Sequence, residues 1–294
     1  MHGLYFRVPD ASVRAILLAS CHDQRGIVAA VSDFVYRNGG NILDFDQHTD
    51  VDDGTFLQRL SWDLAGFGIA REGIAEAFRP IAERFGMEWA VRFTDHVPRL
   101  AIFVSKLDHC LFDLLWRHRI GELRAEVPFV IGNHPDLRPV AEGFGIPYFV
   151  HSFTPTTKAV EEQAMLRRLR EANVELIVLA RYMQVLGDAF VHEYPRRMIN
   201  IHHSFLPAFP GARPYQRAYE RGVKVIGATG HYVTTELDEG PIIDQDVVRV
   251  SHRDSVADLV LKGRDLEKVV LARAVNLHLS HGVLVYGNKT VVFD

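Results

Sequence analysis

From about Arg99 onward, short apolar runs alternate with longer amphipathic segments, and this alternation constrains the fold more than any other feature of the chain. Leu100–Val104 and Leu176–Leu179 are apolar runs of strand length, whereas Lys158–Asn173 has the length and apolar spacing of a helix. Because a parallel connection must cross over the sheet, strands that alternate with helices predict an α/β fold with a doubly wound, mainly parallel sheet. The other expected elements are strands at 127–131, 147–150 and 198–201, helices at 109–119, 136–144 and 255–281, and a final hairpin that turns near Gly287 and Asn288.

The N-terminal part has a different order of elements, strand-helix-strand-strand-helix-strand. Gly39-Gly40 ends the first helix, and Asp52-Asp53-Gly54 is a hairpin signal between the second and third strands. This order predicts a ferredoxin-like βαββαβ domain. The polar segment Thr94–Pro98 is expected to link a domain of residues 1–94 to one of residues 95–294. The expected strands are 13–20, 42–51, 55–62 and 87–93, and the expected helices are 26–38 and 73–85.

Composition and charge argue against several classes of protein. The 294 residues are 48% hydrophobic and carry a formal net charge of −4, so a broad basic surface for nucleic acid is not expected. Apolar runs are shorter than the roughly 18 residues of a membrane span, and Met1–Asp10 lacks the apolar core of a signal peptide. Cys21 and Cys110 are too few for a disulfide framework, and adjacent His202-His203 is weak evidence for a metal because strand neighbours face opposite ways. A cytoplasmic protein with reduced thiols is expected, without metal, cofactor, nucleic acid or membrane.

Asn200 and His202 form the strongest candidate for chemistry. They follow the apolar residue Ile199 and are two residues apart, so at the end of a strand they point to the same face. Asn can stabilise an oxyanion, His can move a proton near neutral pH, and the carboxylate of Asp238 can hold the attacking group and tune the His. By itself, such a pattern fits a polar strand end with an unrelated surface acid better.

The surrounding residues carry a family resemblance that changes this balance. Asn200–Gly211 (NIHHSFLPAFPG), Gly227–Thr235 (GATGHYVTT) and Asp238, 38 residues after Asn200, resemble the active-site region of the 10-formyltetrahydrofolate-dependent formyltransferases. The resemblance runs from about Arg99 to the C-terminus. It implies that Asn200 donates to the formyl oxygen, that His202 donates to the developing oxyanion or moves the proton, and that Asp238 positions and activates a water molecule.

The same resemblance implies where the pterin ring of the folate binds. Backbone groups of Arg181–Val185 and Thr234–Asp238 are expected to contact its polar edge. Met183, Val185 and Leu186 are expected to supply apolar walls. Core packing is the alternative for Met183 and Leu186. His203 and Ser204 support the site or are structural, and Cys110 is not expected to be a nucleophile. The expected folate contacts are Arg181, Tyr182, Met183, Gln184, Val185, Leu186, Thr234, Thr235, Glu236 and Leu237.

Cys21–Val28 (CHDQRGIV) resembles the turn of ACT domains, which often bind amino acids or pair with one another. By this resemblance, Asp23, Arg25, Gly26 and Ile27 are the candidate site for an amino-acid effector, and a homo-oligomer is expected. The glycine would let a ligand or a second chain approach the start of the helix. The alternative is that Asp23 only caps the helix and that the domain only dimerises.

An ACT-like domain joined to a formyltransferase-like domain resembles the formyltetrahydrofolate deformylases, which Val104–Leu111, Asn133–Asp136 and Ala180–Val185 also match. The resemblance implies hydrolysis of 10-formyltetrahydrofolate to formate and tetrahydrofolate, in support of purine biosynthesis. The loop Ser105–His109 favours water as the acceptor, because it lacks the glycines that would cradle a substrate phosphate. Two alternatives stay open: a formyltransferase that acts on a small amine, and a non-catalytic sensor.

Overall fold

The chain divides into two units in the computed structural model, which describes residues 12–208 and 214–293. One unit contains the residues up to Val97 and those from Ser280 onward, and the other runs from Pro98 to Leu279. The segment Met1–Asp10 and the last three residues of Asn200–Gly211 lie outside the described residues. Within the described ranges, no helix is both long enough and apolar enough to cross a membrane.

The N-terminal unit has the ferredoxin-like βαββαβ order that the sequence predicts. Its four antiparallel strands form a sheet in the order β2-β3-β1-β4. Both helices pack on one face of this sheet, where Phe34 and Phe78 meet edge to face beside the buried ring of Trp62. The elements are β1 (Arg14–His22), α1 (Ile27–Arg37), β2 (Ile42–Asp50), β3 (Thr55–Asp63), α2 (Ile74–Phe85) and β4 (Glu88–Phe93).

The C-terminal hairpin belongs to this N-terminal unit. It consists of β12 (Val283–Tyr286) and β13 (Lys289–Val292). The Tyr286 hydroxyl donates to Asp50 at 3.0 Å, and Lys289 Nζ lies 2.9 Å from the carboxylates of both Asp50 and Asp53. The sequence assigns the hairpin to the domain of residues 95–294, so the structure differs there. Local periodicity identifies a hairpin but not its distant partner, which here is the turn between β2 and β3.

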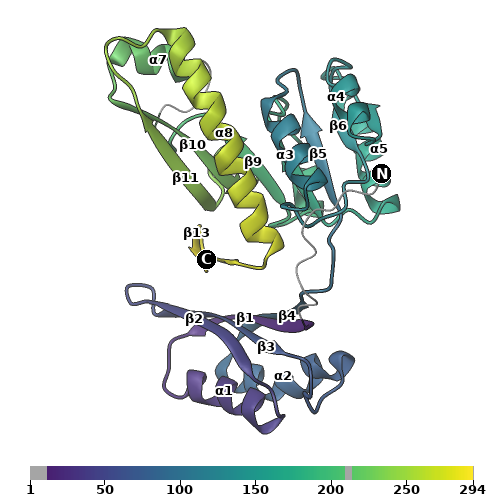
Figure 1. Ribbon diagram of the computed structural model, residues 1–294, viewed down its shortest axis with the longest axis vertical. Coiled ribbons are helices and arrows are strands. Elements are labelled where there is room, and N and C mark those ends of the chain that lie inside the picture. The colour runs from purple at the N-terminus through teal and green to yellow at the C-terminus, as the bar shows by residue number, and fades with distance from the viewer. Residues whose placement is uncertain (1–11, 209–213, 294) are drawn as a thin grey trace. The chain divides into compact units, whose positions relative to one another are not determined.

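The second unit is built on a seven-stranded sheet in the order β11-β10-β9-β8-β5-β6-β7 (Figure 1). The five strands from β9 to β7 are parallel, which confirms the predicted doubly wound sheet, and β10 and β11 add an antiparallel edge. The strands are β5 (Leu100–Val104), β6 (Val130–Gly132), β7 (Tyr148–Val150), β8 (Leu176–Leu179), β9 (Met198–His202), β10 (Val225–Tyr232) and β11 (Ile242–Arg249). The helices are α3 (His109–Arg119), α4 (Arg138–Gly143), α5 (Lys158–Glu171), α6 (Asp188–Glu193), α7 (Pro214–Arg221) and α8 (Val256–Leu279).

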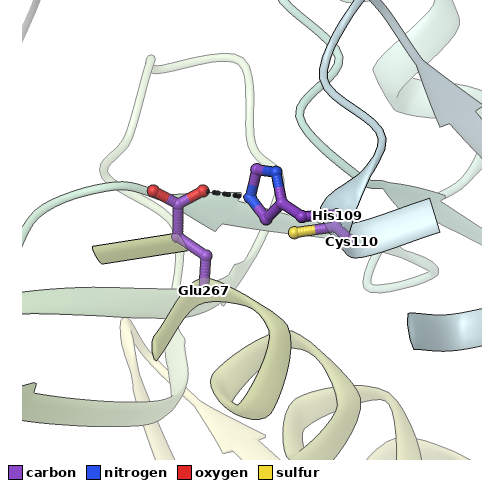
Figure 2. Close-up of side chains that lie close together, drawn as sticks. All are labelled: His109, Cys110 and Glu267. Atoms are coloured by element: carbon purple, nitrogen blue, oxygen red, sulfur yellow. Dashed lines mark hydrogen bonds and ion pairs between the residues drawn. The ribbon is translucent and has the colours of Figure 1, made fainter. Parts of the chain in front are cut away.

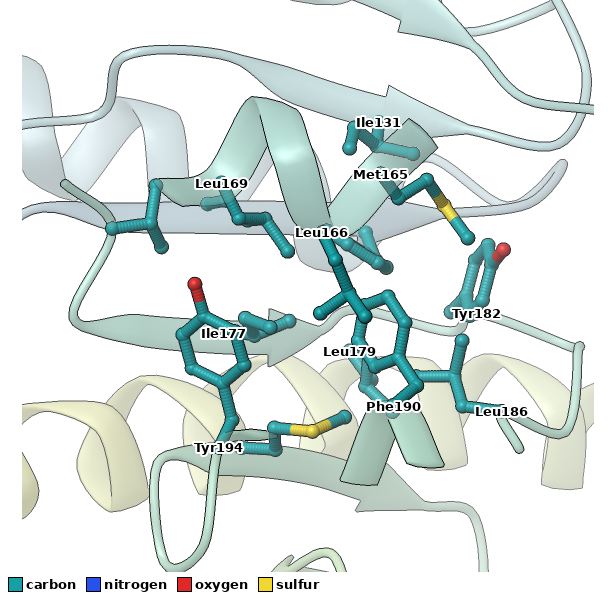
Figure 3. Packing of buried hydrophobic residues seen from close by; sticks show 14 of the residues in the cluster. Ile131, Met165, Leu166, Leu169, Ile177, Leu179, Tyr182, Leu186, Phe190 and Tyr194 are labelled. Carbon is teal, nitrogen blue, oxygen red and sulfur yellow. The ribbon is translucent and has the colours of Figure 1, made fainter. Parts of the chain in front are cut away.

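Helices cover both faces of this sheet. On one face, Met165, Leu166 and Leu169 of α5 and Phe190 of α6 pack against the strands (Figure 3). On the other face, α8 crosses β9, β10 and β11, and Gly230 of β10 lets it approach, because a Cβ there would lie 2.8 Å from that of Ala274. The first strand of the unit, β5, lies between β6 and β8, so the chain order reverses beside it. Ligands of such sheets bind at the carboxyl ends of the strands near this reversal.

Candidate active site

Asn200 and His202 lie at the carboxyl end of β9, on the face that carries the core residue Met198. The antiparallel strand β10 places His231 opposite Asn200. The chain then turns back, and Asp238 occupies this turn in a left-handed backbone conformation (φ 59°) that residues other than glycine seldom adopt. β9, β10 and the turn after β10 therefore bring the three predicted catalytic residues together.

Asp238 and His202 form a hydrogen-bonded pair. His202 Nδ1 lies 3.2 Å from Asp238 Oδ2 and donates to it, since a carboxylate oxygen accepts. This hydrogen bond lowers the pKa of Asp238 below its ordinary value and outweighs the opposing effect of burial, so the carboxylate is ionised at neutral pH. His202 Nε2 is buried and has no hydrogen-bond partner among the described residues. The pair therefore presents a free ring nitrogen whose orientation is set by a carboxylate.

Asn200 is held by His231, a residue that the sequence does not single out. His231 Nδ1 donates to the carbonyl oxygen of Tyr232 at 3.0 Å, and burial lowers the pKa of His231, so its ring is neutral and Nε2 accepts. The Nδ2 group of Asn200 lies 3.2 Å from this Nε2 and donates one hydrogen to it. The second hydrogen has no acceptor among the residues that the structure describes, so it is available to a ligand. The signal in the sequence was the place of His231 within Gly227–Thr235, but only the strand register pairs it with Asn200.

A cavity of about 380 Å³ lies in front of these groups. It is bordered by Asn200, His202, His231 and Asp238 and by every residue that the sequence predicts as a folate contact. Met183 and Val185 are 58% and 61% exposed and can contact a ligand. Tyr182 and Leu186 belong to the buried core cluster (Figure 3) and also border the cavity, whereas Met183 is not part of that core.

A second polar cluster surrounds Glu267, a fully buried residue of α8. His109 Nε2 lies 2.8 Å from one carboxylate oxygen (Figure 2), and the Tyr215 hydroxyl donates to the other at 2.5 Å. Arg181 Nε lies 3.4 Å away, an ion pair without hydrogen-bond geometry. Burial alone would raise the pKa of Glu267, but these three groups outweigh it and leave the pKa lowered. The sequence does not reveal this cluster, whose members lie on four separate segments.

The donor atoms of His109, Cys110 and Glu267 lie within 4.8 Å of one another, close enough to be considered as metal ligands. However, both carboxylate oxygens of Glu267 already accept hydrogen bonds. Burial raises the pKa of the Cys110 thiol well above its usual value, whereas metal binding requires the thiolate. The cluster therefore fits a hydrogen-bond network better than a metal site, and the protonated thiol is no nucleophile.

His203 lies between the two polar clusters. Its ring is 5.1 Å from that of His202 and 6.0 Å from that of Tyr215, which it meets edge to face. Burial first, and then the nearby charge of Arg181, lower the pKa of His203 to about 4. Because β9 ends at His202, the strand rule that separates neighbouring side chains does not keep His203 from the cavity, which it borders.

The candidate effector residues lie in the N-terminal unit at the start of α1. Gly26 is the N-cap residue, with φ 93°, and its carbonyl accepts from the Ala30 amide at 2.9 Å. Within the described residues, no side chain caps this helix, so the alternative that Asp23 serves as the cap is wrong. Asp23 and Arg25 are exposed and Ile27 is buried. Effector binding there stays a prediction.

Comparison with known proteins agrees with this arrangement. Residues 98–275 match the family described as formyl transferase. The chain belongs to the formyl transferase family. A formyltetrahydrofolate deformylase of Synechocystis sp. is 56% identical and covers 96% of this chain and 99% of its own length. Within the family the chain also resembles the crystal structure of a deformylase from Pseudomonas syringae, at 45% identity and a TM-score of 0.94, with 98% of this chain and 96% of that one covered.

Members of this family with a different activity share only part of the chain. The glycinamide ribonucleotide transformylase 1 of Symbiobacterium toebii is 31% identical, with a TM-score of 0.64. It covers 69% of this chain and 97% of its own length. This chain therefore resembles the named deformylases over nearly its whole length and the transformylase over about two thirds.

Proposed function

We propose that the chain hydrolyses 10-formyltetrahydrofolate to formate and tetrahydrofolate. The observation that carries this proposal is the meeting of Asn200, His202 and Asp238 at a cavity bordered by all the expected folate contacts. The high identity to a named deformylase over almost the full chain supports water, rather than an amine, as the acceptor.

Three groups have complementary roles in the proposed reaction. The oxygen of water bonds to the formyl carbon, the bond between that carbon and N10 breaks, N10 takes up a proton, and formate leaves. The free hydrogen of Asn200 Nδ2 stabilises the developing oxyanion. Nε2 of His202 also donates to it when both ring nitrogens carry a hydrogen, and His202 passes that proton on to N10. Asp238, ionised at neutral pH, orients His202 and accepts a hydrogen bond from the water.

The direct test mixes the purified full chain with 10-formyltetrahydrofolate and no amine, and follows formate and tetrahydrofolate over time. Equal and continuing release of both is expected. A formyltransferase would release neither until an amine was supplied, and a sensor would stop after at most one equivalent per chain.

The reaction is further proposed to need no metal or nucleotide cofactor. A cytoplasmic enzyme with this activity would supply formate and balance the one-carbon pools used in purine biosynthesis. All its proposed chemical roles are met by side chains of the chain itself, with folate as the substrate.

The N-terminal unit is proposed to be an ACT domain that binds an amino acid near Asp23, Arg25, Gly26 and Ile27 and joins chains into a homo-oligomer. Its βαββαβ order and the exposed turn before α1 support this. The test titrates amino acids against formate release in the full chain and in Asp23→Ala, with Asp52→Ala as an exposed control, and measures mass by light scattering. Identical responses would leave the unit with an assembly role at most.

A further inference from the structure

His203 borders the cavity but has no role in the reaction as described above. Its ring lies 5.1 Å from that of His202, and its second neighbour, Tyr215, contacts it through the ring edge. Among the described residues, no hydrogen bond to a ring nitrogen of His203 accounts for its position. A partly buried imidazole that faces a cavity and has no hydrogen-bond partner in the described part of the chain is a candidate to bind a small polar molecule there.

The chemical state of His203 suits it to accept a hydrogen bond. With a pKa of about 4, the ring is neutral in the physiological range and one of its nitrogens carries a lone pair. Arg181, which is itself held by Glu267, contributes to this by disfavouring a second positive charge. Burial is the larger cause of the lowered pKa of His203, and Glu267 acts in the opposite direction by raising it.

A water molecule that attacks a carbonyl carbon must direct a lone pair at it. It does so when both of its hydrogens are held by acceptors on the far side. Asp238 supplies one acceptor, and it borders the same cavity as His203. A second acceptor beside it would complete the arrangement.

We propose that His203 is this second acceptor and that, with Asp238, it holds the attacking water. The assignment rests on the proposed hydrolysis. One hydrogen of the water is directed at Asp238 and the other at His203. The oxygen then bonds to the formyl carbon, the bond to N10 breaks, and the two protons end on N10 and in solution, leaving formate. His203 positions the water and does not keep a proton.

Two variants separate a role as acceptor from a role in packing. His203→Gln retains an oxygen that can accept a hydrogen bond, whereas His203→Phe retains the ring volume without an acceptor. The rate of formate release is expected to fall by about 100-fold in His203→Phe and by about tenfold in His203→Gln. His252→Phe, on an exposed loop, is the matched control and should keep the wild-type rate.

Hydroxylamine supplies a readout that a packing defect would not move. Its nitrogen can attack the formyl carbon in place of water and give formohydroxamate, and a nucleophile of this strength depends less on two positioned acceptors. The ratio of formohydroxamate to formate is therefore expected to rise in His203→Phe, while calorimetry shows that tetrahydrofolate still binds.

Several outcomes would overturn the assignment. They are a wild-type formate rate in His203→Phe, a faster rate in His203→Phe than in His203→Gln, an unchanged product ratio, or loss of folate binding in both variants, which would make His203 a structural residue. If the wild-type chain itself releases no formate, the proposed function fails instead, so the two failures are distinguishable.

Discussion

Asp238 and Glu267 are both carboxylates among histidines in the second unit, but their surroundings differ. The side chain of Asp238 is 16% exposed, borders the cavity and accepts a hydrogen bond from His202. The side chain of Glu267 is 1% exposed and is surrounded by His109, Tyr215 and Arg181. Both have a lowered pKa, so both are ionised at neutral pH.

The difference shows that a perturbed carboxylate alone does not identify a catalytic group. Around Glu267, both oxygens are occupied and no ligand has to be invoked to explain the arrangement. Around Asp238, the partner His202 keeps a buried Nε2 without a partner among the described residues, and a hydrogen of Asn200 is uncommitted. Polar groups that face a cavity and lack hydrogen-bond partners indicate a catalytic site, whereas buried groups whose hydrogen bonds are all made indicate a structural role.

The comparison is tested most strongly by Asp238→Asn. The variant is expected to lose about 10³-fold in turnover while it still binds folate and keeps its stability, because the carboxylate acts on the reacting centre. Formate release and tetrahydrofolate binding are measured together, with Asp265→Asn, which is 77% exposed, as control. Turnover near that of the wild type would remove Asp238 from the mechanism.

Glu267→Gln is expected to reduce the stability of the fold, in contrast to Asp238→Asn, which is expected to reduce turnover. Removing the charge leaves Arg181 unpaired in a buried site and is expected to lower the free energy of unfolding by about 3 kcal/mol at pH 7. Because the pKa of Glu267 is lowered on folding, its contribution is complete above the unfolded value near 4.5 and is lost as the pH falls through the folded pKa. The gap between variant and wild type should therefore narrow below about pH 4.5.

Denaturant unfolding at several pH values measures this gap, with Glu171→Gln, on the exposed side of α5, as control. A variant as stable as the wild type at pH 7, or a gap that widens in acid, would contradict the supporting role of Glu267.

A smaller effect is expected for His231→Phe, which keeps the ring but removes the acceptor for Asn200. The amide of Asn200 could then rotate away from the formyl oxygen, so turnover should fall by about 10- to 100-fold with little change in folate affinity. Steady-state kinetics give the two parameters separately. A rise in KM with an unchanged kcat would mean that His231 helps to bind folate rather than to orient Asn200.

The smallest effect is expected from chelation. If the Glu267 cluster is a hydrogen-bond network, dialysis against EDTA should change neither formate release nor the unfolding midpoint. If activity or stability is lost and a divalent ion restores it, then His109, Cys110 and Glu267 bind a metal. Glu267 would then be a ligand-binding carboxylate, as Asp238 is proposed to be.

Much of this site could be predicted from local sequence. Asn200 and His202 follow an apolar strand, and their spacing alone places them on one face. Arg181–Val185 lies within the continuous match Ala180–Val185, and it borders the cavity as one segment. The elements α6, α7 and β11 were not predicted. The two helices have six and eight residues, whereas a reliable helical period needs a window of about 11–18 residues, and β11 alternates only weakly.

The sequence by itself indicated the order of elements in the N-terminal unit, the alternation of strands and helices in the second unit, the catalytic candidates and the expected folate contacts. Apolar periodicity and contiguous motifs are local, so they can be read without coordinates. Tertiary structure alone decided that Glu267 meets His109 across 158 positions of sequence, that His231 orients Asn200, and that the C-terminal hairpin packs on the N-terminal unit. Each of these depends on strand register or helix packing, which join residues that are distant in sequence and that no local pattern connects.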